Sequence, residues 1–166
     1  MSGSLTDDAL TNEIRDALRP AQSGRTVILG VGNSMRSDDG VGPYIVKQIV
    51  SSSADIVCID VGVCPENFVG DIIDIRPSKV IVIDAADFGG CCGEPRLIAE
   101  QDIPGSTLTT HSFPISITTR LIASETGCEV FFIGIQVKST AFGEGISEEV
   151  YMGADSVIDC INRECL

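Results

Sequence analysis

Acidic side chains at the ends of apolar runs are the first feature of this 166-residue chain that could carry out chemistry. Asp39 lies in the loop after the first run, Asp60 is at the end of the second, and Asp84 ends the third. The runs have the length and the Ile and Val content of buried strands. In open α/β sheets, ligands bind just beyond the carboxyl ends of the strands. We therefore expect these three carboxylates to converge at one edge of a sheet.

The loop at 30–40 is similar to nucleotide-binding loops only in its glycines. A dinucleotide fingerprint requires a third glycine three residues after Gly32, where Met35 stands, and a phosphate-binding loop requires Gly-Lys-Ser/Thr, which is missing. Asp38 and Asp39 place negative charge where a phosphate would lie, so the loop favours a cation. The alternative interpretation is that both aspartates only cap the helix that follows.

His111 is the single histidine of the chain and lies on a loop that leads into a helix. Any histidine-dependent chemistry must therefore use His111, and a zinc site built from several histidines is excluded. A lone histidine is more often an exposed or hydrogen-bonded structural residue, so this interpretation stays open beside a catalytic or metal-binding one.

The seven cysteines give no zinc-finger spacing, because none of them forms a Cys-x-x-Cys pair. Cys58 lies within an apolar run and Cys128 precedes one, which indicates small core residues. The adjacent pair Cys91 and Cys92 lies on a glycine-rich loop beyond Asp84, where reactive thiols are a second option.

The elements that must position these residues alternate between strands and helices. This alternation predicts an α/β, single-domain three-layer fold, with a mostly parallel twisted sheet of about five strands and helices on both faces. Residues 1–25 are expected to form an N-terminal helical extension with Thr6 as its N-cap, and residues 26–166 the domain itself. We expect strands at 26–30, 56–61, 79–84 and 130–136, an edge strand at 94–99, and helices at 43–49, 68–75, 114–124 and 147–163.

Charge and hydropathy narrow the possible partners. The chain has 24 acidic and 11 basic residues and a formal charge of −13, which repels nucleic acid and anionic lipid. No apolar stretch approaches the roughly 18–20 residues of a transmembrane helix, and the first 25 residues lack the pattern of a signal peptide. We therefore expect a cytoplasmic protein with reduced thiols, without nucleic acid and without membrane insertion.

Several short blocks, taken together and in order, resemble the signature of the hydrogenase maturation endopeptidases. They span most of the chain from Thr26 to Gln136, and a set of ordered blocks is far more specific than any one of them. The blocks are Gly30-Val31-Gly32-Asn33, Asp38 to Pro43, Ile59 to Gly62, Pro65-Glu66-Asn67, Ile83 to Gly89, Thr109-Thr110-His111 and Gly134-Ile135-Gln136.

The resemblance implies an activity and a site. Members of this family remove a C-terminal peptide from the large-subunit precursor of a nickel–iron hydrogenase after nickel insertion. Their two acids and one histidine match Asp39, Asp84 and His111, which would be both the catalytic and the metal-contacting residues. The metal implied is nickel carried by the substrate, and zinc or cadmium suits the same oxygen and nitrogen donors.

Other functions remain as alternatives to this interpretation. A non-proteolytic nickel-binding chaperone for hydrogenase assembly would keep the same three ligands, and a cysteine protease would pair His111 with Cys91 or Cys92. The chain also departs from the family pattern in its extension before Thr26, in its cysteine pair and at Val137, where proline is common. We expect a monomer, because a dedicated surface must stay open for the precursor.

Overall fold

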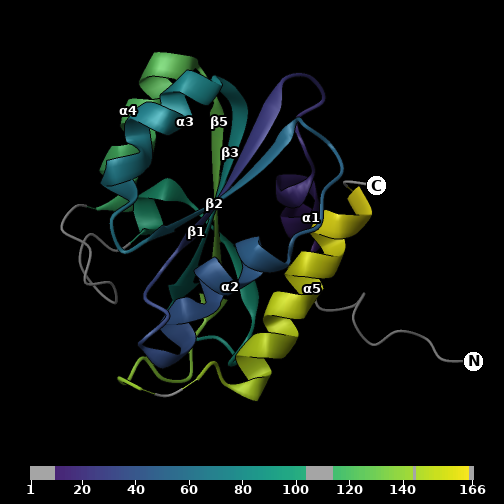
Figure 1. Cartoon of the computed structure of the whole chain (residues 1–166). Helices are drawn as coiled ribbons and strands as arrows, with labels where there is room; N and C mark the ends of the chain where they lie inside the picture. The colour runs from purple at the N-terminus through teal and green to yellow at the C-terminus, as the bar shows by residue number, and fades with distance from the viewer. Residues whose placement is uncertain (1–9, 104–113, 144, 165–166) are drawn as a thin grey trace, which may run out of the picture.

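The computed structural model describes residues 10–103, 114–143 and 145–164, and it is a three-layer α/β domain (Figure 1). Its five strands form one sheet in the order β2-β1-β3-β5-β4, parallel except for β4, which runs antiparallel to β5. The strands are β1 (Arg25–Val31), β2 (Ile56–Gly62), β3 (Pro77–Ala86), β4 (Pro95–Ile98) and β5 (Glu129–Gln136). The helices are α1 (Asn12–Leu18), α2 (Val41–Gln48), α3 (Val69–Ile75), α4 (Ile115–Thr126) and α5 (Glu148–Glu164).

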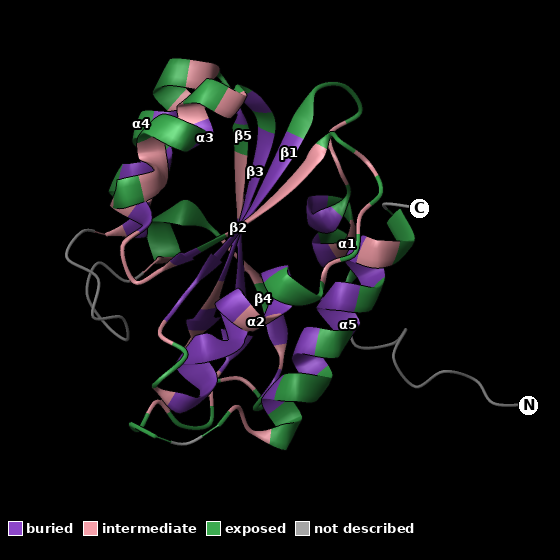
Figure 2. Cartoon of the chain, viewed as in Figure 1, coloured by how far each residue is buried: buried purple, intermediate pink, exposed green. Residues whose placement is uncertain are grey.

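Two apolar clusters hold the layers together, one on each face of the sheet. Helices α1, α2 and α5 pack on one face and share a cluster with Ile28, Ile81 and Ile133. Helices α3 and α4 pack on the other face, against Val27, Val80 and the other strand side chains that point to that face. Successive side chains of a strand point to opposite faces, so β1 and β3 are buried almost throughout (Figure 2). The two central strands therefore form the middle of the buried core.

The fold class is as the sequence predicts, and each expected strand and helix is found within a few residues of its expected position. The N-cap of the first helix was wrongly expected at Thr6, which lies outside the described residues. The helix begins at Asn12, because the Oγ of Thr11 accepts a hydrogen bond from the Ile14 N–H at 3.3 Å. No helix within the described ranges is both long enough and apolar enough to cross a bilayer.

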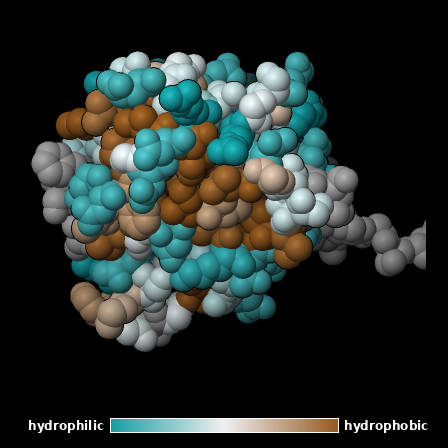
Figure 3. All heavy atoms as spheres, turned by 45° about the horizontal axis from the view of Figure 1, so that its top comes forward, coloured by the Kyte–Doolittle hydropathy of each residue, from teal (hydrophilic) through white to brown (hydrophobic). Residues whose placement is uncertain are grey.

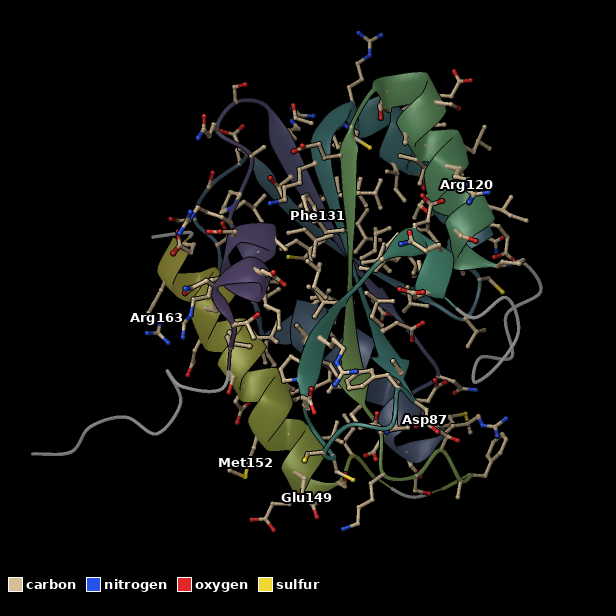
Figure 4. All side chains as sticks on the ribbon, turned by 180° about the vertical axis from the view of Figure 1, so that it is seen from behind. Asp87, Arg120, Phe131, Glu149, Met152 and Arg163 are labelled. Carbon is tan, nitrogen blue, oxygen red and sulfur yellow. The ribbon has the colours of Figure 1, made fainter. Side chains whose placement is uncertain are left out.

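A buried lysine fastens α1 to the sheet. Lys79 in β3 donates from Nζ to the carbonyl oxygens of Asp16 (3.3 Å) and Arg19 (2.5 Å), at the carboxyl end of α1. Its ammonium also lies 4.6 Å from the ring centre of Phe131, a residue labelled in Figure 4. Burial lowers the pKa of Lys79. The carbonyl oxygens and the aromatic ring compensate in part for the loss of hydration.

Two glycines let α2 approach the sheet very closely. A Cβ atom on Gly42 would lie 2.3 Å from the Val31 carbonyl oxygen and 2.5 Å from that of Ile83, and one on Gly30 would lie 2.4 Å from the Gly42 carbonyl oxygen. Only glycine allows contacts this short between backbones. The amino end of α2 is thereby held over the carboxyl ends of β1 and β3.

Candidate functional site

The candidate site lies where β1 and β3 end side by side. Gly30 of β1 pairs with Ile83 of β3, and Asp84 follows at once in β3. Asp39 comes from the 3-10 turn η1 (Ser37–Gly40), which leads directly into α2. The close packing of α2 therefore brings Asp39 to the same edge of the sheet as Asp84, as the sequence predicts for these two acids.

Asp39 is buried, with only 1% of its surface exposed. Its Oδ2 accepts a hydrogen bond from the Asn33 N–H at 2.8 Å, which closes the loop between β1 and η1. Gly32 adopts a φ of +144°, and a Cβ atom there would lie 1.8 Å from the Asp39 carbonyl oxygen. The glycine is thus required by the tight loop that aims Asp39 at the site.

Asp84 is half-buried as a residue, but its Oδ1 is fully enclosed and has no hydrogen-bond partner in the described part of the chain. Burial first, and then the negative charge of Asp39, raise the pKa of Asp84 well above its usual range, although the Ala85 N–H opposes this shift. Two carboxylates that share a poorly solvated space require a proton or a cation. Both acids therefore fit a cation site.

The donor set suits a divalent metal of borderline softness. Two carboxylates and an imidazole would leave coordination positions open for water or a carbonyl oxygen. Within the ranges that the structure describes, no group of three His, Cys, Asp or Glu side chains is close enough to hold a metal ion. His111, the third residue of the predicted set, lies outside those ranges.

Asp38 has a different task from its neighbour. Its carboxylate accepts three backbone N–H groups, from Lys138 (2.8 Å), Ser139 (3.0 Å) and Ser147 (2.7 Å). Burial alone would raise the pKa of Asp38, but the hydrogen bonds of Ser147, Ser139 and Lys138 outweigh it and lower the pKa. Asp38 therefore holds Lys138, Ser139 and Ser147 against η1.

Helix capping, the simple alternative for the two aspartates, is wrong. The N-cap position of α2 is Gly40, and no side chain caps it. Asp60 also departs from the expectation. It is exposed and its Oδ2 lies 2.9 Å from the Lys47 Nζ, while its Oδ1 accepts the Gly62 N–H. Asp60 is thus occupied by α2 and its own turn, and only two of the three strand-end acids meet.

Gln136, at the end of β5, is a positioning residue that the sequence did not single out for this role. It is 5% exposed, and its Oε1 accepts the N–H groups of Phe88 (2.9 Å) and Gly90 (3.1 Å). Its Nε2 donates to Asp87 Oδ1 at 3.0 Å. Gln136 thereby fixes the loop that follows Asp84. The sequence does contain a signal for this role, because Gln136 is a polar residue at the end of an apolar strand.

The loop after β3 also carries the cysteine pair. Cys91 and Cys92 are exposed, and the loop packs against the start of α5, where a Cβ atom on Gly93 would lie 2.0 Å from the Glu149 carbonyl oxygen. Figure 4 shows the labelled residues Asp87 and Glu149 near this end of the molecule. Of the two expected core thiols, Cys128 is buried and Cys58 is only half-buried.

The sequence of this chain is similar to that of hydrogenase maturation proteases. The family model described as hydrogenase maturation protease matches residues 44–164. The hydrogenase 3 maturation protease of Escherichia coli K12 is 34% identical over 133 residues, which cover 79% of this chain and 85% of that protein.

Solved structures agree in fold as well as in sequence. The crystal structure of the [NiFe] hydrogenase maturation protease HycI from Thermococcus kodakarensis superposes with a TM-score of 0.81 at 30% identity, and covers 93% of this chain and 99% of that one. The solution structure of the endopeptidase HycI from Escherichia coli gives 0.73 at 31% identity, with 84% and 90% covered. The matched family model, the relatives at 30% identity or more and the shared fold show that this chain belongs to the hydrogenase maturation proteases and is a peptidase.

Proposed function

We propose that this peptidase removes the C-terminal peptide from the nickel-loaded large-subunit precursor of a nickel–iron hydrogenase. The observation that carries the proposal is the enclosed Oδ1 of Asp84, which has no partner among the described residues and lies beside the Asp39 charge. Such a pair favours a cation strongly, and nickel of the precursor is the cation that a protease of this family meets. Family membership supports the choice of substrate.

In this proposal Asp39, Asp84 and His111 contact the nickel of the substrate. A divalent metal bound there would polarise a nearby carbonyl group and lower the pKa of a bound water. The chain itself supplies the two oriented carboxylates, the Asn33 N–H that fixes Asp39, and the Gln136 contacts that fix the loop behind Asp84. Zinc or cadmium would suit the same donors. We further propose that the enzyme acts in the cytoplasm as a monomer.

The test is intact-mass analysis of a large-subunit precursor incubated with the protein. Nickel-loaded precursor should lose one C-terminal peptide, whereas nickel-free precursor should stay intact. The His111→Ala and Asp84→Asn variants should fail with both forms. Cleavage that proceeds equally well without nickel would contradict the recognition of nickel. Tight nickel binding without cleavage of any precursor would instead favour an assembly chaperone.

A further inference from the structure

The two edge strands of the sheet are built differently. β4 has four residues, begins with Pro95, and carries Arg96, whose guanidinium lies 2.8 Å from Glu94. Short length, proline and charge are the usual protections of an edge against pairing with another chain. β2 has seven residues without proline or lysine, and its first charged residue is Asp60. The outer edge of β2 therefore lacks the protections that β4 has.

The backbone of β2 is suited to accept another strand. The Thr26 N–H of β1 donates to the Asp55 carbonyl at 2.8 Å, which sets the phase of the parallel ladder. In such a ladder, alternate residues direct their backbone groups to the same side. Asp55, Val57 and Ile59 therefore face β1, and Ile56, Cys58 and Asp60 direct their carbonyl groups outward, up to the register shift opposite Gly30 and Val31.

The side chains at this edge are apolar on both faces. Ile56 and Cys58 pack at the margin of the cluster under α2 and α5, and Val57 and Ile59 at the margin of the cluster under α3 and α4. All four are half-buried, and β2 is mainly intermediate in exposure where β1 is buried (Figure 2). Figure 3 shows a hydrophobic band across the centre of the face where Figure 1 labels β2. The edge thus offers apolar contacts to both sides of an added strand.

The edge leads to the candidate site. Gly30 pairs with both Asp60 and Ile83, so β2 ends at the level of Asp84. Neighbouring strands are about 4.8 Å apart, so an added strand would lie roughly 15 Å from β3, a span of about five extended residues. Gly62 has a φ of +55° and no atom within 4 Å of its Cβ position, which leaves the path over the end of β2 open.

We propose that the C-terminal tail of the precursor binds as an additional strand along the outer edge of β2, which delivers the scissile bond to Asp39 and Asp84. This inference rests on the function proposed above. The edge of β2 fits a peptide with an extended backbone and apolar side chains on both faces. A second copy of this chain is disfavoured as the occupant, because each copy carries a net charge of −13.

The experiment compares two lysine substitutions on the full chain with nickel-loaded precursor. Val57→Lys places a charge on the β2 edge, and Met152→Lys places the same charge at a 67% exposed position of α5. We expect Val57→Lys to raise KM about tenfold with little change in kcat, and Met152→Lys to change neither. In hydrogen exchange, precursor should protect the segment 56–62 through the outward amides of Cys58 and Asp60, because the Ile56 and Gly62 N–H groups already have acceptors, and should leave residues 95–98 unchanged.

The outcomes separate this inference from the proposed function. Cleavage that persists with unchanged KM in Val57→Lys, and without protection of 56–62, would overturn the docking edge and leave the proposed function intact. Protection of 56–62 by a precursor that is never cleaved would support the docking edge while the proposed function fails. If sedimentation shows a dimer that Val57→Lys dissociates without any effect on processing, a second copy covers the edge and the proposal is overturned.

Discussion

Asp38 and Asp39 are neighbours in the chain, but they lie in opposite electrostatic environments. Asp38 is surrounded by three backbone N–H donors that stabilise its charge. Asp39 accepts the Asn33 N–H and lies against the like charge of Asp84. The hydrogen bonds lower the pKa of Asp38, whereas burial and the charge of Asp39 raise the pKa of Asp84. The carboxylate of Asp38 holds a loop in place, whereas the carboxylates of Asp39 and Asp84 are available for a cation.

A carboxylate in this fold therefore serves stability or function according to the hydrogen-bond donors around it. Backbone N–H groups make Asp38 part of the fold, because a charged acceptor with several donors is stabilised in the folded state. The shortage of donors at Asp84 makes it costly in the folded state unless a cation is bound.

The largest effect is expected at the site. Asp39→Asn and Asp84→Asn should each lower the processing rate by roughly 10³-fold, because each removes a charge that contacts the reacting centre. The measurement is the initial rate of peptide release from nickel-loaded precursor, with circular dichroism to confirm the fold. Asp60→Asn is the matched control, since this exposed acid is paired with Lys47, and its rate should stay near that of the wild type.

The next effect is on stability and belongs to Asp38. Asp38→Ala should lower the free energy of unfolding by about 3 kcal/mol, because three backbone donors lose a charged acceptor at a buried position. Urea unfolding of the metal-free protein measures it. The lowered pKa means that the stabilisation by Asp38 is present above its ordinary pKa of 3.8 and is lost as pH falls through the lower folded value. If the free energy of unfolding falls by well below 1 kcal/mol at neutral pH, Asp38 does not hold the loop in the way described.

Asp84→Asn should stabilise the metal-free protein by about 1–2 kcal/mol at neutral pH, although the same variant lowers the processing rate. The folded-state pKa of Asp84 is raised, so its penalty is absent at pH values below the ordinary pKa and appears as pH rises through the folded value. The gain of the variant should therefore increase from acid to neutral pH. Urea unfolding at a series of pH values measures this, and a variant less stable than the wild type throughout would contradict the account.

The smallest effect concerns the loop behind Asp84. Gln136→Met should cost about 1 kcal/mol in unfolding free energy, because the Phe88 and Gly90 N–H groups lose their acceptor. Processing should fall by a few-fold, mainly in kcat, if the loop positions Asp84. Hydrogen exchange of residues 86–92 provides the structural measurement. Unchanged exchange there would show that Gln136 does not hold the loop.

Some of the site was accessible from the sequence and some was not. The positions of Asp39 and Asp84 followed from the ends of apolar runs, since parallel strands place their carboxyl ends at one edge. The same rule wrongly included Asp60, because Lys47 of α2 lies within reach of its carboxylate and pairs with it. The role of His111 stays a prediction, since it lies outside the described residues.

The amino-acid sequence by itself determined the layered α/β fold, because apolar periodicity and Gly and Pro punctuation act over short ranges along the chain. Tertiary structure decided which of two adjacent aspartates holds a loop, because the donors for Asp38 come from residues 138–147, about 100 positions away. Tertiary structure also decided how closely α2 packs on β1 and β3. Contacts between distant segments depend on how the layers pack, and no local pattern encodes them.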